Sequence, residues 1–252
     1  MKSTNLIELE CCKEIAVLRL NRPEVHNAVN ADMMTQWETH LDTIETDSQI
    51  RAIIITGKGS DTFCAGGDLK YFASLDTQSA CVDMSHRMQA ILNRMSCGKK
   101  VVVGAINGQA LGGGCEICLA CHYTIAADHA TFAFRQAANG IITGWGGGRR
   151  FFKRVGKSSA LRLLLTGERI NAKDALNIRL IDQVVASEDL LPTAKNLVGK
   201  INANSQQSVE AFLKMADIFD NANDQNFIQF EADAFPGLFL GKNFRKILKN
   251  YI

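Results

Sequence analysis

The stretch KVVVGAINGQALGGGCEICLAC, residues 100–121, decides the fold of this chain. Its opening run, 100–106, is apolar and rich in valine, which is typical of a strand buried on both faces. The Asn-Gly pair at 107–108 predicts a turn, and the glycines at 112–114 come directly before a helical pattern. Strand, glycine loop and helix in this order predict one unit of an α/β fold.

The same plan occurs once earlier in the chain. Residues 52–56, within RAIIITGKGSDTF, form an apolar strand, and the polar loop after it leads to CAGGDL at 64–69. Long apolar runs separated by helices are typical of parallel strands, whereas half-exposed strands alternate polar and apolar residues. The sequence therefore predicts an α/β fold with largely parallel sheets.

Further elements follow from local patterns. A strand is predicted at 14–20, where Asn-Arg-Pro ends it, and another at 123–127. Asn30 is a suitable N-cap for a helix whose apolar face consists of Met33, Met34, Trp37, Leu41 and Ile44. Later helices are predicted in GKSSALRLLLTG, 156–167, and at 209–219, 225–234 and 243–249.

Composition limits the class of protein. The chain has 252 residues, of which 46% are hydrophobic, so it can bury a substantial core. A net charge of +2, without a run of like charges, gives no reason to expect a nucleic-acid or membrane partner. No segment approaches the ~20 apolar residues of a membrane span, and the N-terminus lacks the apolar stretch of a signal peptide. We expect a cytoplasmic protein.

Three cysteines in the opening stretch raise the possibility of a metal site. Cys115, Cys118 and Cys121 have the spacing with which thiolates reach zinc or iron. On a helix, however, each step of three residues advances by about 300°, so the three thiols drift around the cylinder. A packed apolar helix is favoured, and a cysteine-rich metal-binding protein remains the alternative from another functional class.

The two glycine loops are candidate anion sites. Glycines before a helix let main-chain N–H groups face a ligand, and the helix dipole adds partial positive charge. Neither loop matches the phosphate-binding pattern GxxxxGK[ST] or the dinucleotide pattern GxGxxG. Two loops that each follow a buried strand could bring two N–H donors to one developing oxyanion. Tight turns or close helix–sheet contacts are the alternative explanation of the same glycines.

Three motifs carry a family resemblance. NRPEVHNA (21–28), FCAGGDL (63–69) and NGQALGGGCE (107–116) resemble those of the enoyl-CoA hydratase/isomerase, or crotonase, superfamily, in the same order. The resemblance implies a spiral of ββα units over residues 1–190 and a C-terminal helical trimerisation region over 191–252. It also implies an acyl-CoA substrate, a homotrimer or dimer of trimers, and no cofactor apart from the coenzyme A that the substrate carries.

The resemblance also assigns roles to single residues. Gly67 and Gly113 are expected to donate their main-chain N–H groups to the thioester oxygen. Glu116 is expected to transfer a proton, although a helix-capping glutamate is the alternative at this position. The second glutamate of family hydratases corresponds to Gln136, which cannot exchange a proton at neutral pH. Hydration or isomerisation is the reaction that the resemblance implies. Because Gln136 replaces the second glutamate, decarboxylation of a short malonyl-type thioester is the alternative.

Substrate contacts are expected along the same loops. The resemblance places coenzyme A beside the segment after Cys64, with Lys70 as the nearest basic side chain for its phosphates. Trp145, in GIITGWGGGRR, either lines the acyl pocket or fills core space. The expected coenzyme A contacts are Ala65, Gly66, Asp68, Leu69 and Lys70.

Overall fold

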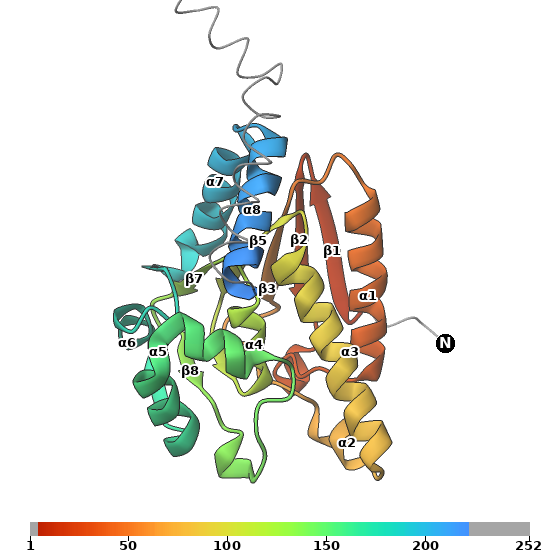
Figure 1. The fold of residues 1–252 in the computed structure, drawn as a ribbon, viewed down its shortest axis with the longest axis vertical. Helices are drawn as coiled ribbons and strands as arrows, with labels where there is room; N and C mark the ends of the chain where they lie inside the picture. The colour runs from red at the N-terminus through yellow and green to blue at the C-terminus, as the bar shows by residue number, and fades with distance from the viewer. Residues whose placement is uncertain (1–4, 222–252) are drawn as a thin grey trace, which may run out of the picture.

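The computed structural model of the chain describes residues 5–221, and Figure 1 shows how its helices surround the strands. The larger sheet within this range has six strands in the order β1-β2-β3-β5-β7-β10. Strands β2 through β10 run parallel to their neighbours, and only the pair β1–β2 is antiparallel. The strands are β1 (Ile7–Cys12), β2 (Ile15–Leu20), β3 (Ala52–Gly57), β5 (Val101–Ile106), β7 (Tyr123–Ala127) and β10 (Gln183–Val185).

A smaller sheet has four strands in the order β4-β6-β8-β9. Strands β4, β6 and β8 are parallel, and β9 is antiparallel to β8. Each of β3, β5 and β7 is followed directly in the chain by a strand of this smaller sheet. The repeated step from one sheet to the other produces the predicted spiral. The short strands are β4 (Thr62–Cys64), β6 (Gln109–Leu111), β8 (Thr131–Ala133) and β9 (Arg169–Asn171).

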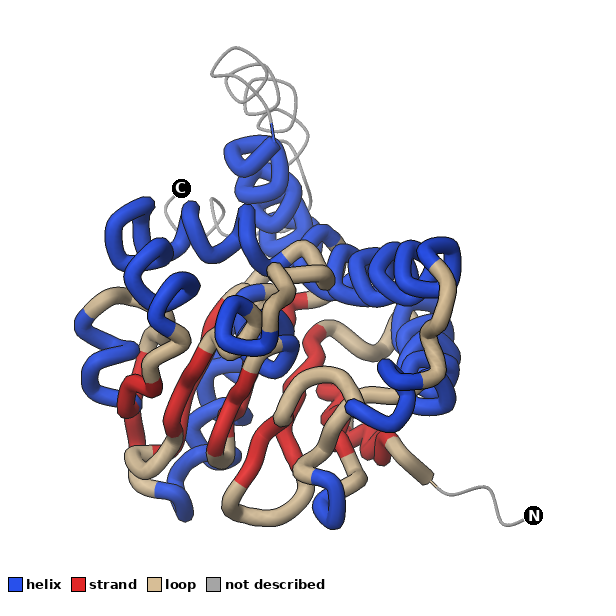
Figure 2. The backbone as a smooth tube through the Cα atoms, turned by 90° about the horizontal axis from the view of Figure 1, so that it is seen from below, coloured by secondary structure: helices blue, strands red, loops and turns tan. Residues whose placement is uncertain are grey.

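Eight α-helices lie within the described range, and Figure 2 shows them around the strands. The first confirms its prediction closely: the side chain of Asn30 accepts a hydrogen bond from Met33 N, and the five predicted apolar residues are those that are buried. The helices are α1 (Ala31–Thr46), α2 (Leu69–Ala73), α3 (Gln78–Cys97), α4 (Gly113–Leu119), α5 (Gly147–Thr166), α6 (Ala172–Asn177), α7 (Leu190–Asn202) and α8 (Gln206–Asn221).

The core lies on both faces of the six-stranded sheet. On one face, alternate strand residues pack with α1, α3 and α4 in the main apolar cluster. On the other face, Val17, Ile54 and Val103 pack against α7 through residues such as Ala194 and Val198. Both faces are covered, so the central strands are apolar throughout, as their sequences indicate.

Several elements were not predicted from the sequence, among them the short strands of the smaller sheet, β10, α6 and α7. Strand β1 was not predicted, because its sequence IELECC mixes charged and apolar residues and is partly exposed. Helix α5 is longer than predicted: it begins at Gly147, and Gly156, with φ 76°, separates its two halves. Only the second half had been predicted, since a glycine in the left-handed region interrupts the helical pattern.

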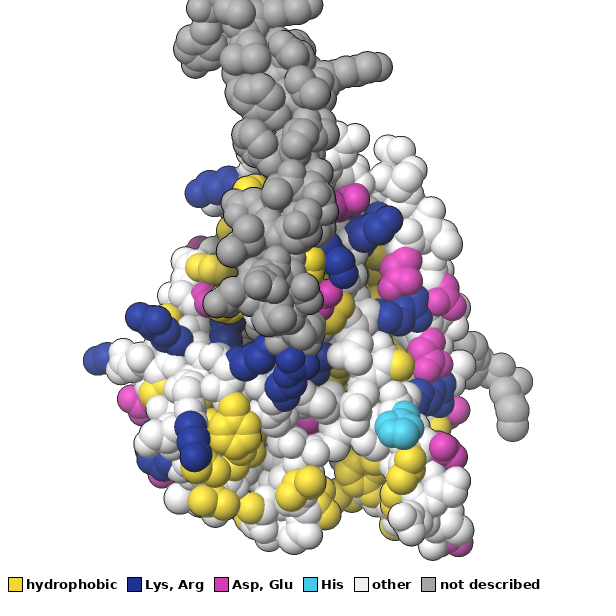
Figure 3. All heavy atoms as spheres, in the orientation of Figure 1, with side chains coloured by type: hydrophobic (Ala, Val, Ile, Leu, Met, Phe, Trp, Pro, Cys, Tyr) yellow, Lys and Arg dark blue, Asp and Glu magenta, His cyan; other side chains and the backbone are white. Residues whose placement is uncertain are grey.

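The C-terminal predictions are only partly covered by the structure. The helix predicted at 209–219 lies within α8, whereas those at 225–234 and 243–249 fall outside the described residues. A boundary at residue 190 coincides with the start of α7, and the division into core and trimerisation region remains a prediction. In the range 5–221 no helix combines the length and apolar character of a membrane span. The face in Figure 3 carries both basic and acidic side chains.

Candidate active site

The two glycine loops meet at the same edge of the smaller sheet. Strands β4 and β6 are parallel neighbours, so the loops that follow them emerge side by side. A Cβ built on Gly66 would lie 2.9 Å from the main-chain nitrogen of Gly113, which brings the two main chains into direct contact. Gly66 and Gly112 have φ values of 95° and 53°, a region in which other residues are strained. The two loops are therefore in contact, as sequence analysis predicted.

Main-chain hydrogen bonds fix the first loop against the segment after the NRP motif. Val29 N donates to Gly66 O at 2.8 Å, and Asp68 N donates to Val29 O at 2.8 Å. Gly67 lies between these two bonds, and among the described residues no acceptor pairs with its N–H. The N–H of Gly113 also has no such partner in that range. Both groups that sequence analysis selected as donors are thus available to a ligand.

Asp68 fastens the end of the first loop. Its Oδ2 lies 2.8 Å from Nη1 of Arg22, and its Oδ1 accepts hydrogen bonds from Lys70 N and Tyr71 N at the start of α2. Burial alone would raise the pKa of Asp68, but the hydrogen bonds from Arg22, Tyr71 and Lys70 and the charge of Arg22 leave that pKa lowered. The carboxylate therefore stays ionised. Its neighbour Leu69 is 77% exposed.

Glu116 lies in the buried helix that follows the second loop. Only 2% of the residue is exposed, and its carboxylate accepts three hydrogen bonds. Oε2 receives the N–H groups of Trp145 and Gly147 at 2.9 and 2.8 Å, and Oε1 receives Nε2 of Gln136 at 3.1 Å. A Cβ on Gly147 would lie 2.4 Å from Cγ of Glu116, so the approach of the two elements requires glycine there.

These contacts argue against Glu116 as a cap of its own helix. A cap of α4 would accept N–H groups at the start of that helix, yet the main-chain partners of Glu116 are Trp145 and Gly147, at the start of α5. Burial raises the pKa of Glu116, and the hydrogen bonds from Gly147, Trp145 and Gln136 offset only part of that rise. A buried carboxyl group with a raised pKa is suited to proton transfer near neutral pH.

Two aromatic rings flank the candidate donors. The ring of Trp145, which is 3% exposed, contacts Gly113: a Cβ built there would lie 2.3 Å from Cζ3. The ring of Phe72, in α2, contacts Gly67 in the same way, at 2.0 Å from Cζ. Trp145 therefore both fills core space and borders the site. Sequence analysis missed Phe72, although an aromatic residue five positions after a loop glycine could have indicated it.

The remaining candidates occupy the surroundings of Glu116 and the first loop. Gln136 is 6% exposed and contacts Glu116, as their alignment with a carboxylate pair suggested. Ala65 N donates to His26 O at 3.0 Å, and Lys70 is exposed on α2. The structure thus brings together the candidate catalytic residues and one pocket residue: Gly67, Gly113, Glu116, Gln136 and Trp145. The expected coenzyme A contacts lie in the segment from the end of β4 to the start of α2: Ala65, Gly66, Asp68, Leu69 and Lys70.

The cysteine-rich helix is a packing element. Cys115, Cys118 and Cys121 are all buried, and burial raises the pKa of the Cys121 thiol to about 12. The Sγ atom of Cys115 donates to Ala110 O at 3.0 Å. Across residues 5–221 no cluster of three or more His, Cys, Asp or Glu side chains could hold a metal ion. Nothing in this part of the chain favours the metal-binding alternative.

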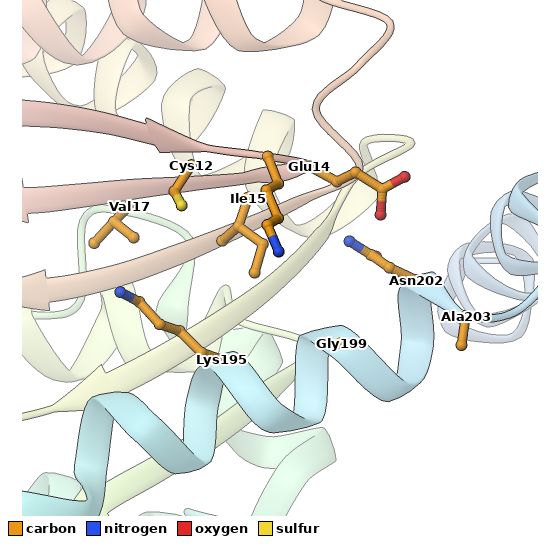
Figure 4. A pocket seen from close by; sticks show the side chains of 9 residues that line it. Cys12, Glu14, Ile15, Val17, Lys195, Gly199, Asn202 and Ala203 are labelled. Carbon is orange, nitrogen blue, oxygen red and sulfur yellow. The ribbon is translucent and has the colours of Figure 1, made fainter.

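A surface pocket of about 430 Å³ lies elsewhere, between the β1–β2 hairpin and α7. Figure 4 shows Glu14 and Ile15 on the hairpin side and Lys195 and Asn202 on the helix side. None of the residues that line it belongs to the glycine loops or to α4. The candidate site is therefore defined by its hydrogen-bonding groups and not by this pocket.

Comparison with known proteins gives consistent matches along nearly the whole chain. A family model described as enoyl-CoA hydratase/isomerase matches residues 10–252. Crotonyl-CoA hydratase of Syntrophomonas wolfei is 34% identical over 235 residues, which cover 93% of this chain and 90% of the relative. Short-chain-enoyl-CoA hydratase of Clostridium acetobutylicum is 34% identical over 244 residues, covering 95% and 91%.

Solved structures agree with the sequence matches. The crystal structure of an enoyl-CoA hydratase from Bacillus anthracis superposes with a TM-score of 0.92 at 28% identity, covering 98% of this chain and 95% of that one. Pseudomonas aeruginosa DspI superposes with a TM-score of 0.93 at 27% identity, covering 100% and 95%. The fold predicted from the three motifs is thereby confirmed.

Proposed function

Because the chain belongs to the enoyl-CoA hydratase/isomerase family, or crotonase superfamily, and is an enzyme of that family that acts on acyl-CoA thioesters, we propose that it hydrates short 2-enoyl-CoA thioesters. The relatives named crotonyl-CoA hydratase and short-chain-enoyl-CoA hydratase support the choice of reaction and of chain length. Such a step belongs to fatty acid metabolism.

The observation that carries this proposal is the contact between the two glycine loops. Gly66 and Gly113 touch, and the N–H groups of Gly67 and Gly113 have no acceptor among the described residues. In the proposed reaction both donate to the thioester oxygen. That oxygen gains negative charge as the α-carbon becomes part of an enolate, and losing one preorganised donor to such an oxyanion costs roughly 3 kcal/mol.

Glu116 is the proposed proton-transfer group. It lies one helical turn after Gly113, is buried, and has a raised pKa whose first cause is that burial. Its three hydrogen bonds hold the carboxylate in one orientation. A fixed carboxyl group with a raised pKa provides the acid/base function that hydration requires.

Substrate binding and assembly complete the proposal. Ala65, Gly66, Asp68, Leu69 and Lys70 would lie along coenzyme A, and Trp145 would border the acyl group. The enzyme would need no cofactor other than the coenzyme A of its substrate. We further propose a cytoplasmic homotrimer or dimer of trimers, in which residues 191–252 contribute contacts between subunits.

The test is a panel of thioesters given to the purified enzyme. It contains 2-enoyl-CoA thioesters of increasing chain length, a 3-enoyl-CoA, and malonyl-CoA and methylmalonyl-CoA. We expect loss of the conjugated double bond and a 3-hydroxyacyl-CoA product by mass spectrometry, with the fastest turnover on the shortest chains. The Glu116→Gln variant, which keeps an acceptor oxygen for Gly147, serves as the control and should lose this activity.

Two results would contradict the proposal. Release of carbon dioxide from a malonyl-type thioester, without hydration of any 2-enoyl-CoA, would assign the decarboxylase reaction that Gln136 suggests. Full hydratase activity in Glu116→Gln would leave the reaction in place but remove Glu116 from it.

A further inference from the structure

Gln136 carries a buried acceptor atom that no group in the described part of the chain satisfies. The residue is 6% exposed, and its Oε1 has no hydrogen-bond partner among the described residues. A buried polar atom without a partner costs about 1–3 kcal/mol, so such atoms are rare in folded proteins. This acceptor therefore points to a donor other than the described residues.

The orientation of the amide follows from its neighbour. Nε2 of Gln136 lies 3.1 Å from Oε1 of Glu116, and an ionised carboxylate can only accept hydrogen bonds. The nitrogen is therefore the end of the amide that is bonded to Glu116, and the oxygen is the end without a partner. The hydrogen-bond network thus fixes which end of the amide is unpartnered.

The amide also lies close to the oxyanion donors. Gln136 precedes a 3₁₀-helix, Ala137–Asn139, and a Cβ built on Gly112 would lie 4.0 Å from its Nε2. Gly112 is the N-cap of α4 and the neighbour of the donor Gly113. The amide of Gln136 therefore lies beside both Glu116 and the loop that carries Gly113.

We propose that Gln136 is a positioning residue whose Oε1 accepts a hydrogen bond from the reacting water, and that Glu116 is the only group that carries a proton through the reaction. This inference rests on the proposed hydratase function. It differs from a mechanism with two carboxylates, because a neutral amide can orient water but cannot exchange a proton with it.

The proposed step balances with one carboxylate. An O–H bond of the water breaks, its proton goes to Glu116, and the oxygen forms a bond to the β-carbon. The π electrons of the double bond shift so that negative charge develops on the thioester oxygen. The N–H groups of Gly67 and Gly113 stabilise this charge by hydrogen bonding. Glu116 then returns its proton to the α-carbon, the thioester carbonyl re-forms, and the carboxylate is regenerated. Water has been added and no redox partner is required.

The experiment is the pH dependence of kcat/KM for hydration of crotonyl-CoA by three proteins. The wild type should show one ionisation in the site, with activity rising as Glu116 deprotonates, since kcat/KM reports groups of the free enzyme. Gln136→Met keeps the side-chain length without polar atoms. It should lower kcat by about 10²-fold with a much smaller change in KM, as expected for lost positioning.

Gln136→Glu supplies the diagnostic result. It places two carboxylates at about the 3.1 Å separation of the present pair, and like charges that close share a proton. A second ionisation should therefore appear, and the profile should become bell-shaped. Gln183→Met, on the distant strand β10, controls for loss of a partly buried glutamine and should keep wild-type kinetics.

Distinct outcomes separate this inference from the proposed function. If the wild type hydrates crotonyl-CoA and Gln136→Met retains its kcat, the role of Gln136 is refuted while the hydratase function stands. A bell-shaped wild-type profile that persists in Gln136→Met would show a second proton carrier and would also refute it. If no enoyl-CoA is hydrated, both proposals fail.

Discussion

Each glycine loop carries one carboxylate, and the two carboxylates lie in opposite environments. Asp68, directly after Gly67, is paired with Arg22 and has a lowered pKa. Glu116, three residues after Gly113, is buried, has no cation among its hydrogen-bond partners in the described range, and has a raised pKa. Environments that push two pKa values apart separate a fixed charge from a proton carrier. The comparison supports an anchoring role for Asp68 and the proposed proton transfer by Glu116.

The strongest test of this comparison replaces each carboxylate by its amide. Glu116→Gln should lower kcat by about 10³-fold, within the range for loss of a general acid or base. Asp68→Asn should lower it by only about tenfold, because main-chain hydrogen bonds still orient the loop around Gly67. Steady-state kinetics on crotonyl-CoA measures both, with circular dichroism as the control for folding. Equal losses of kcat in the two variants would contradict the assignment of different roles to the two carboxylates.

The two donors should also differ in their tolerance of a methyl group. Gly113→Ala would push against the ring of Trp145, which is 3% exposed and cannot retreat, so kcat should fall by about 10²-fold. Gly67→Ala would meet Phe72 on the short, exposed helix α2, and that ring can move. We expect a loss of about tenfold or less there. Adding Trp145→Ala to Gly113→Ala should restore part of the activity; no recovery would refute the steric explanation.

Removing the cation beside Asp68 tests the anchor through stability. Arg22→Met keeps the length of the side chain but leaves the carboxylate without its ion pair, and it removes the hydrogen bond from Arg22 to Ala28 O. The free energy of unfolding at pH 7 should fall by about 2 kcal/mol, measured by urea denaturation. The exposed pair Lys58–Glu8 offers a control, since Lys58→Met should change stability by less than about 1 kcal/mol.

The smallest expected effect is a difference in how the two carboxylates change stability with pH. The lowered pKa of Asp68 means that its ionised form adds stability above its unfolded pKa, about 3.9, and that this is lost as pH falls through the folded pKa. The raised pKa of Glu116 has the opposite effect on the pH dependence of stability. The folded state binds that proton more tightly, so stability falls as pH rises from about 4.3 through the folded pKa.

Urea denaturation between pH 3 and pH 8 would measure this contrast. Relative to the wild type, Asp68→Asn should be less stable at neutral pH and nearly equal in acid. Glu116→Gln should gain relative stability toward neutral pH, because it removes a buried charge there. Each change should be on the order of 1 kcal/mol. Parallel pH profiles for the two variants would contradict the opposite pKa directions.

Local patterns predicted much of the fold because they reflect local physics. The apolar runs that became β3, β5 and β7 are buried on both faces, and Asn30 begins α1 through a hydrogen bond to Met33 N. The strand β1 and the first half of α5 were missed. Strand β1 is partly exposed and mixes charged with apolar residues. The first half of α5 ends at Gly156, whose left-handed backbone breaks the helix, so the two halves do not share one helical repeat of apolar residues.

Sequence analysis selects candidate site residues only as far as the motifs extend. Gly67, Gly113 and Glu116 lie within contiguous motifs, and Gln136 follows from alignment of a neighbouring loop. The partners of Glu116 could not be predicted, since Trp145 and Gly147 are 29 and 31 residues further along and contact it only through the tertiary fold. The unpartnered oxygen of Gln136 likewise appears only when the surrounding chain is in place.

The bonds from Trp145 and Gly147 to Glu116 have an evolutionary consequence. The oxygen of Glu116 that is proposed to carry the proton also accepts the two hydrogen bonds that fix the start of α5, whose first half ends at the kink at Gly156. A substitution of Glu116 that changed the chemistry would also remove the hydrogen bonds that fix the start of α5. Divergence at this position is therefore constrained twice over, and new activities would arise more readily by altering what faces the carboxylate than by replacing it.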